Sequence, residues 1–127
     1  MFGRDRVIQN VRTEGYLDGA SNHMRRKEHG TGNSGWISWR IIPQGNGTVL
    51  IQNIETGGFL DGGSNHMRPK EHGTGNSGWI SWRIIPQGNG SVLIQNVKTG
   101  GFLDGGNNHM RPWEHGTGNS GWISWRI

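Results

Sequence analysis

Short runs with apolar residues at every second position recur along the whole chain. In its middle part, Val49–Asn53 is rich in branched apolar residues, and Phe59–Leu60 follows a Thr-Gly-Gly turn. Segment 79–85 has isoleucine or tryptophan at positions 80, 82 and 84, while the polar segment 66–71 contains a proline. A period of two predicts half-buried strands, and the proline restricts 66–71 to an edge or irregular strand. The middle of the chain is therefore predicted to contain four short strands.

The same pattern occurs three times, because the chain consists of three near-identical copies of a 43-residue unit. The first repeat covers residues 1–41, the second 42–84 and the third 85–127. One stretch, Glu-His-Gly-Thr-Gly-Asn-Ser-Gly-Trp-Ile-Ser-Trp-Arg-Ile, begins unchanged at Glu28, Glu71 and Glu114. No segment has helical periodicity, so we predict an all-β protein of about twelve short strands. Repetition at this period places the copies around a pseudo-threefold axis or along a stack.

Three units of four strands fit a β-trefoil, a six-stranded barrel capped by three hairpins, as a single domain over residues 1–127. Barrel closure also removes exposed sheet edges. The alternative is a β-propeller, whose blades also have four strands, but three blades would need two or more chains to close a ring. The predicted core repeats one set of five apolar positions: Ile8, Leu17, Ile37, Trp39, Ile41, Ile51, Leu60, Ile80, Trp82, Ile84, Ile94, Leu103, Ile123, Trp125 and Ile127.

Composition adds limits to this picture. Only 30% of the residues are hydrophobic and 24 are glycine, but seven tryptophans compensate because each buries a large area. The net charge of +4 is spread along the chain, so we expect no specific binding of nucleic acid. No apolar run approaches the roughly 18 residues that span a bilayer. Without cysteine or a recognisable signal peptide, we expect a soluble protein, cytoplasmic or non-classically secreted, as a monomer or small homo-oligomer.

The order of motifs within each repeat resembles that of the ricin-B-chain-like β-trefoil lectins. A Gly-Asn-Gly turn precedes Val49–Asn53, a Thr-Gly-Gly turn follows it, and Phe59–Leu60 runs into Asp61 and two glycines. The resemblance extends over all three repeats. One element differs, because the family's Gln-x-Trp is replaced by Ile37-Ser-Trp39 and its two equivalents. The resemblance implies a carbohydrate-binding β-trefoil from a divergent branch of the family.

In such lectins, the aspartate after the second strand of a repeat accepts hydrogen bonds from sugar hydroxyls, and an aromatic ring stacks on the sugar. Asp18, Asp61 and Asp104 match that aspartate. The family's aromatic position in the third strand holds Lys27, Lys70 and Trp113. Either the tryptophan that opens Trp-Ile-Ser-Trp or a histidine would then replace the aromatic residue, or polar contacts alone would hold the sugar. Nearby carboxylates, amides and imidazoles can both accept from and donate to hydroxyls, and glycines allow close backbone approach.

The candidate sugar-binding residues are the carboxylate, amide, imidazole, glycine and indole groups between the second and fourth strands of each repeat. They are Asp18, Asn22, His23, Glu28, His29, Asn33 and Trp36 in the first repeat; Asp61, Gly62, Gly63, Asn65, His66, Glu71, His72, Asn76 and Trp79 in the second; and Asp104, Gly105, Gly106, Asn108, His109, Glu114, His115, Asn119 and Trp122 in the third.

Structural roles remain open for the same residues. An aspartate before Gly-Gly can simply close a turn through the backbone, a histidine can make a structural hydrogen bond, and the Glu-His-Gly-Thr-Gly-Asn segment can be an ordinary loop. Zinc ligation by His23, Glu28 and His29 matches no common spacing, so no metal or other cofactor is expected. A paired-carboxylate glycosidase built on Asp18 and Glu28 is a minor alternative, and we predict no catalytic residues.

The predicted function is therefore that of a non-enzymatic lectin with three equivalent sugar sites that agglutinates cells or glycoproteins. Its partners would be glycans on glycoproteins or cell surfaces, with galactose or N-acetylgalactosamine favoured by the resemblance and mannose-type glycans as the alternative. The competing hypothesis is a symmetric scaffold or protein-interaction trefoil, natural or designed, without a sugar site. Identity among the repeats does not separate these, because duplication or imposed symmetry makes functional and silent positions equally alike.

Overall fold

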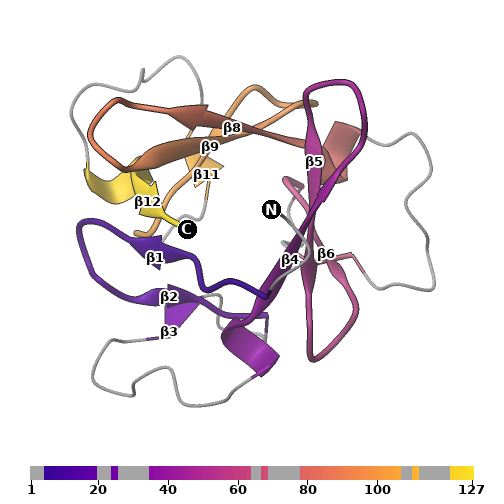
Figure 1. Cartoon of the computed structure of the whole chain (residues 1–127), viewed down its shortest axis with the longest axis horizontal. Helices are drawn as coiled ribbons and strands as arrows, with labels where there is room; N and C mark the ends of the chain where they lie inside the picture. The colour runs from indigo at the N-terminus through magenta and orange to yellow at the C-terminus, as the bar shows by residue number, and fades with distance from the viewer. Residues whose placement is uncertain are drawn as a thin grey trace.

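The computed structural model describes residues 5–19, 24–25, 35–63, 67–68, 78–106, 110–111 and 121–127. Within these ranges, twelve strands join into one antiparallel sheet that curls around a central axis (Figure 1). Six strands form its inner ring: β1 (Gln9–Asn10), β4 (Trp39–Pro43), β5 (Val49–Asn53), β8 (Trp82–Pro86), β9 (Val92–Asn96) and β12 (Trp125–Arg126). The other six are β2 (Tyr16–Leu17), β3 (Met24–Arg25), β6 (Phe59–Leu60), β7 (Met67–Arg68), β10 (Phe102–Leu103) and β11 (Met110–Arg111).

The six inner strands close on one another as a barrel. Strands β4 and β5 pair over five residues, from Trp39 opposite Asn53 to Pro43 opposite Val49, and β8 and β9 pair in the same register. Neighbouring repeats are joined where Val49 lies opposite Trp82 and, at the equivalent place, by the bridge between Arg6 and Trp39. Strands β1 and β12 pair antiparallel and complete the ring.

The remaining strands form three two-stranded hairpins: β2 with β3, β6 with β7, and β10 with β11. Each hairpin is attached to the barrel through a glutamine: Gln9 lies opposite Tyr16, Gln52 opposite Phe59, and Gln95 opposite Phe102. A six-stranded barrel with three such hairpins is the β-trefoil that the sequence predicts.

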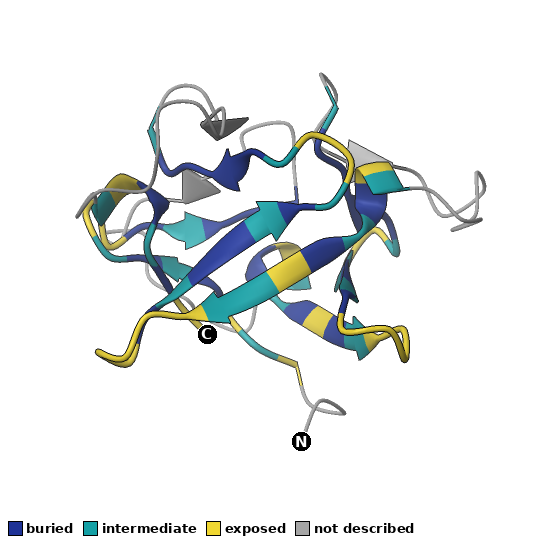
Figure 2. Ribbon diagram, turned by 90° about the horizontal axis from the view of Figure 1, so that it is seen from above, coloured by how far each residue is buried: buried dark blue, intermediate teal, exposed yellow. Residues whose placement is uncertain are grey.

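The core lies on the barrel axis, where the buried positions of all three repeats meet (Figure 2). Trp39, Trp82 and Trp125 are each 0% exposed and belong to one cluster with the inward isoleucines and leucines. The predicted core is confirmed at thirteen of its fifteen positions. Of the other two, Ile84 is partly buried and packs against the core, whereas Ile127 is 37% exposed because β12 ends at Arg126.

One predicted strand begins later than its period of two suggests. Residues Gly78–Ile80 form a single 3-10 turn, η4, and the strand starts only at Trp82; η2 (Gly35–Ile37) and η6 (Gly121–Ile123) are the equivalent turns. The alternation of burial still holds, since Ile80 and Trp82 are fully buried on either side of Ser81. These turns are the helices of the described ranges, and none is long and apolar enough to cross a membrane.

Candidate functional site

The candidate aspartates directly follow the second strand of each repeat, and the core fixes their position. In the second repeat, Trp82 Nε1 donates a 2.9 Å hydrogen bond from inside the barrel to the carbonyl of Leu60, the residue before Asp61. Trp39 and Trp125 make the same bond to Leu17 and Leu103. The buried tryptophan that fills the core therefore also anchors the backbone that presents the aspartate.

The aspartates are largely buried, with relative exposures of 6% for Asp18, 9% for Asp61 and 8% for Asp104. Asp61 Oδ1 accepts the backbone N–H of Gly63 at 2.8 Å, and Asp104 Oδ1 accepts that of Gly106 at 2.7 Å. The turn-closing role that the sequence left open for these residues is therefore present. A carboxylate has about four lone-pair sites, so it can accept several hydrogen bonds at once.

A backbone carbonyl joins this turn to the 3-10 turn and to the next repeat. The carbonyl of Trp79 accepts the N–H of Gly62 at 2.7 Å and Asn96 Nδ2 at 2.8 Å. Asn96 Oδ1 in turn accepts the N–H groups of Lys98 and Thr99. The same arrangement joins Gly19, Trp36 and Asn53, and also Gly105, Trp122 and Asn10. Each site is thus held in place by two repeats.

The hydrogen bonds that Gly62 and Asn96 donate to the Trp79 carbonyl are here called the joint. Gly62 must be a glycine for this joint to form. A Cβ at Gly62 would lie 2.5 Å from Asn96 Cγ and Nδ2, which is closer than carbon atoms approach in proteins. Gly19 and Gly105 are in the same contact with Asn53 and Asn10. These glycines are needed because a side chain comes close to them, and not because of a left-handed backbone.

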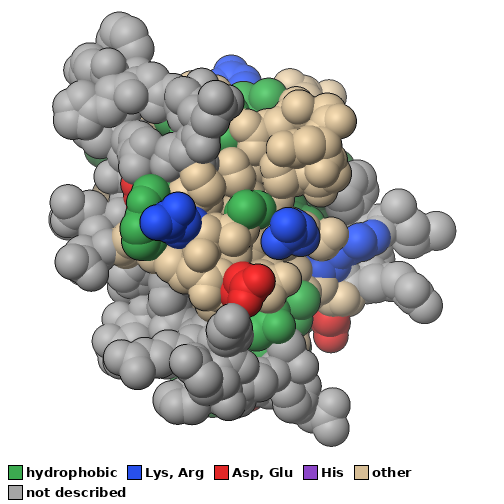
Figure 3. All heavy atoms as spheres, turned by 90° about the vertical axis from the view of Figure 1, so that its left-hand side faces the viewer, with side chains coloured by type: hydrophobic (Ala, Val, Ile, Leu, Met, Phe, Trp, Pro, Cys, Tyr) green, Lys and Arg blue, Asp and Glu red, His purple; other side chains and the backbone are tan. Residues whose placement is uncertain are grey.

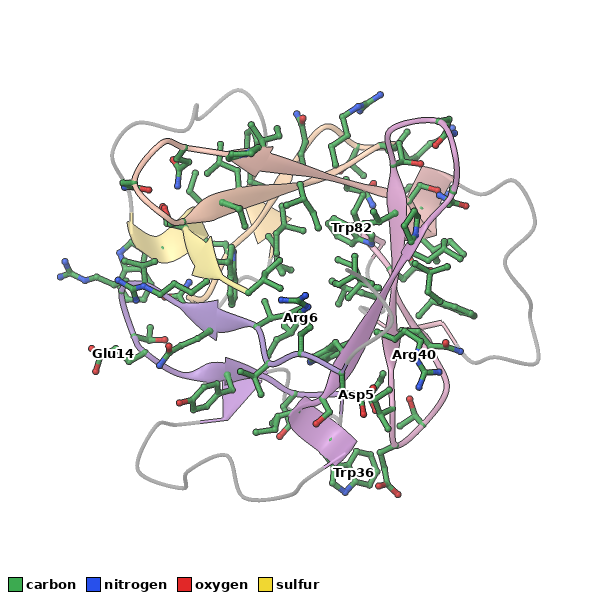
Figure 4. The ribbon with its side chains drawn as sticks, in the orientation of Figure 1. Asp5, Arg6, Glu14, Trp36, Arg40 and Trp82 are labelled. Atoms are coloured by element: carbon green, nitrogen blue, oxygen red, sulfur yellow. The ribbon has the colours of Figure 1, made fainter. Side chains whose placement is uncertain are left out.

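In the second and third repeats, the tryptophan that opens Trp-Ile-Ser-Trp, here called the outer tryptophan, lies beside the aspartate. A Cβ at Gly63 would lie 3.2 Å from Asp61 Oδ1 and 3.7 Å from Trp79 Cε3, so the carboxylate and the indole flank the same point. Trp36, Trp79 and Trp122 are 38%, 39% and 38% exposed. Figure 4 shows Trp36 at the periphery of the molecule and Trp82 within the barrel. A partly exposed indole beside a carboxylate offers an apolar face and a hydrogen-bond acceptor together.

The side chain next to this tryptophan differs in charge among the repeats. Lys98 Nζ lies 5.9 Å from the ring centroid of Trp79, and Arg12 Cζ lies 5.5 Å from that of Trp122. At the first site the corresponding residue is Glu55, whose Oε1 would lie 3.0 Å from a Cβ at Gly35. The described basic side chains on the face drawn in Figure 3 stand apart from one another, separated by neutral surface.

Most other candidates lie outside the described residues. These are Asn22, His23, Glu28, His29 and Asn33, with Asn65, His66, Glu71, His72 and Asn76, and Asn108, His109, Glu114, His115 and Asn119. The described part of each site consists of the aspartate, the two residues after it as far as they are described, and the outer tryptophan. Within that part of the chain, no three His, Cys, Asp or Glu side chains gather to hold a metal ion.

Sequence reasoning missed two kinds of residue at this site. Asn10, Asn53 and Asn96 end their strands and contact the 3-10 turn of another repeat. The tryptophan carbonyl lies 17 residues away from Asn53 and Asn96 and 112 residues away from Asn10, so no local pattern could reveal the contact. Glu55 and Lys98 carried a visible signal, since the second and third repeats differ in charge there.

Comparison with known proteins agrees with this architecture. Residues 38–122, two thirds of the chain, match the family model described as ricin-type beta-trefoil lectin domain-like. No curated protein matches the chain by sequence. Among solved structures, the designed threefold-symmetric protein ThreeFoil superposes with a TM-score of 0.75 at 13% identity, covering 94% of each chain.

Two further structures share the fold. The BEL beta-trefoil superposes with a TM-score of 0.74 at 10% identity, covering 99% of this chain and 92% of that one. A GlcNAcα1-4Gal-releasing endo-β-galactosidase from Clostridium perfringens has a TM-score of 0.75 at 14% identity, covering 96% of this chain but 31% of the enzyme. At such low identities these likenesses concern the fold alone.

Proposed function

The chain belongs to the ricin-type beta-trefoil lectin domain-like family, and from this membership we propose that it is a non-enzymatic lectin with three sugar sites. Each site would be built on one aspartate and the outer tryptophan beside it. Galactose or N-acetylgalactosamine is the proposed ligand, and mannose-type glycans are the alternative. The candidate amides and imidazoles of the same repeat would supply further donors.

The observation that carries this proposal is the pairing of Asp61 with Trp79, repeated as Asp104 with Trp122. The aspartate is the residue that the family resemblance selects, and the tryptophan is a candidate to replace the family's aromatic residue. A sugar ring has an apolar face and a rim of hydroxyls, so it needs a flat apolar surface and an acceptor side by side. The indole supplies the first and the carboxylate the second. The hydrogen bonds at the Trp79 carbonyl hold the backbone that carries both groups, and the Gly63 N–H holds the Asp61 carboxylate, so the cost of ordering them on binding is reduced.

Three sites on one rigid barrel would act together on clustered glycans. Each site would be weak alone, but linking binding events can raise avidity by about 10²–10⁴ where the geometry allows simultaneous contact. Agglutination of cells or glycoproteins is the expected activity. A monovalent sugar should inhibit it at far higher concentration than a clustered glycoprotein does.

A glycan array on the unmodified chain, followed by a charge-removing variant, tests the proposal. The triple variant Asp18→Asn, Asp61→Asn and Asp104→Asn keeps an oxygen that can accept the turn N–H but removes the charge. Hydrogen bonds to charged groups contribute about 1 kcal/mol more than neutral ones, so binding at each site should weaken roughly fivefold to tenfold.

The matched control is Asp5→Asn, because the Asp5 carboxylate is 51% exposed and pairs with Arg40 at 3.6 Å instead of with a turn glycine. This variant should agglutinate like the unmodified protein. If the triple variant folds and binds glycans with unchanged affinity, the proposed site is wrong. If the unmodified chain binds nothing on the array, the lectin proposal itself fails.

A symmetric scaffold without a sugar site is the second candidate, supported by the near-identity of the repeats and by the likeness to a designed threefold protein. Absence of binding on the glycan array, by a protein that is folded and stable, would favour the scaffold. The enzyme alternative is tested on the same glycans, since steady loss of a bound oligosaccharide on incubation would indicate hydrolysis.

A further inference from the structure

The residue two positions after the anchoring asparagine is held in the same place in all three repeats. Backbone N–H groups of Arg12, Glu55 and Lys98 each donate to the asparagine Oδ1, at 3.0, 3.1 and 3.1 Å. Each N–H also points at the carbonyl of the glycine that begins a 3-10 turn, at 3.2 Å. These backbone hydrogen bonds thus place the side chain of this residue beside the outer tryptophan of the neighbouring repeat, whatever charge the side chain carries.

The charge of the side chain at this position differs among the three repeats. Lys98 faces the Trp79 ring and Arg12 faces the Trp122 ring at cation–π distance, while Glu55 takes the same position beside Trp36. All three side chains are exposed, and an exposed cation–π contact stabilises by only about 0.5–1 kcal/mol. The cations therefore stay close to the indole yet can still pair with an anion that approaches from solvent.

We propose that the sites at Trp79 and Trp122 select sugars that carry an anionic group, a carboxylate or a sulfate, and that the site at Trp36 selects against them. The inference rests on the proposed lectin function and adds the class of sugar to it. A ring bound against the indole places its substituents within a few ångströms of the Lys98 ammonium or the Arg12 guanidinium. At that range opposite charges attract and Glu55 repels.

The carboxylate and the cation of one site also lie at different parts of the tryptophan ring. Asp61 lies beside the Cε3 edge of the Trp79 ring, while Lys98 stands over the ring centroid. A hydroxyl could reach the carboxylate and an acidic substituent the ammonium without exchanging places. Arg12 offers a planar fork that matches a carboxylate or sulfate in two hydrogen bonds, whereas Lys98 acts as a point charge.

The chain supplies its own matched substitutions for a test. Lys98→Glu with Arg12→Glu gives every site the charge of the first, and Glu55→Lys gives the first site the charge of the second. Arg83→Glu with Arg126→Glu is the control for net charge, because it makes the same two changes from a basic to an acidic residue. Arg83 and Arg126 are exposed residues on barrel strands β8 and β12, opposite Gln95 and Gln9. Calorimetric titration at low salt would compare a neutral oligosaccharide with its sialylated and its sulfated forms.

We expect the unmodified chain to bind an anionic form roughly twofold to fivefold more tightly than the neutral one, and less so as salt is added. The variant with Lys98→Glu and Arg12→Glu should lose this preference, and the control with Arg83→Glu and Arg126→Glu should keep it. Glu55→Lys should add a binding equivalent for the anionic sugar. A preference for the sialylated or for the sulfated form alone supports the inference and names the group.

The inference is overturned if the variant with Lys98→Glu and Arg12→Glu keeps the preference or if Glu55→Lys adds no equivalent. Equal binding of neutral and anionic sugars by the unmodified chain also overturns it, but leaves the lectin proposal intact. Failure to bind any of the three sugars rejects both.

Discussion

Replacing Gly62 by alanine tests the joint that holds each site. The added Cβ would lie 2.5 Å from two atoms of the Asn96 side chain, so either the backbone moves or Asn96 turns away. Overpacking of this kind costs about 1–3 kcal/mol. Turning Asn96 away instead loses its three shorter hydrogen bonds, with Trp79, Lys98 and Thr99, at about 1 kcal/mol each. Both routes predict that Gly62→Ala lowers the free energy of unfolding by about 2–3 kcal/mol.

A double-mutant cycle separates this explanation from a general intolerance of the turn. Asn96→Ala alone should cost about 2–3 kcal/mol for the same three hydrogen bonds, and it also removes the atoms that collide with the new methyl group. The double variant should then be no less stable than Asn96→Ala, which gives a coupling energy of about 2 kcal/mol. Pairs that do not interact add to within about 0.5 kcal/mol.

Urea unfolding followed by tryptophan fluorescence provides the assay, since the chain has seven tryptophans. Gly63→Ala is the control in the neighbouring position. Its Cβ would approach only Asp61 Oδ1 closely, at 3.2 Å, and the first repeat already has Ala20 there. We expect it to cost less than about 1 kcal/mol. Additive costs for Gly62→Ala and Asn96→Ala, or equal costs at Gly62 and Gly63, would refute the reasoning.

Three further outcomes follow from single residues. Glu14 has a φ of 64° where the other repeats have glycine, so Glu14→Gly should raise the free energy of unfolding by about 0.5–1 kcal/mol, while Glu14→Ala should not; thermal melts would check both. Trp82→Phe removes the bond to the Leu60 carbonyl and some core volume, and should lower stability by about 2–4 kcal/mol in a urea titration. Trp79→Ala removes a ring that is 39% exposed; it should weaken glycan binding at its own site by about tenfold, by loss of stacking, and unfold at nearly the same urea concentration.

The fold was accessible to sequence reasoning because its signals are local and occur three times. Val49–Asn53 and Phe59–Leu60 were predicted with the bounds that the structure gives. Strand β8 was predicted to start at Trp79, three residues before its observed start at Trp82. The reason is that the carbonyl of Trp79 accepts hydrogen bonds from Gly62 and Asn96 instead of pairing within the sheet. No periodicity within that segment could reveal two partners that lie in other parts of the chain.

In the candidate site too, some residues could be predicted from a local pattern and others could not. The aspartates and outer tryptophans could be selected from their places in the repeat, and their closeness follows from the barrel. The roles of the asparagines and of the charged residues two positions later could not be predicted, because these roles depend on contacts between one repeat and the next. Ile127 illustrates the opposite error: three equivalent positions suggested three equal environments, but β12 pairs with β1 over only two residues.

Because each asparagine serves the tryptophan of a neighbouring repeat, no repeat completes a site by itself. The ring closes where Asn10 reaches Trp122, 112 positions away along the chain. A free peptide with the sequence of one repeat would leave its asparagine and its tryptophan carbonyl without each other, unless it passed the asparagine to a second copy. Three such copies in a ring could form all three joints by cyclic symmetry. The joint thus offers a route by which a homotrimer of a short ancestor could have preceded the fused chain.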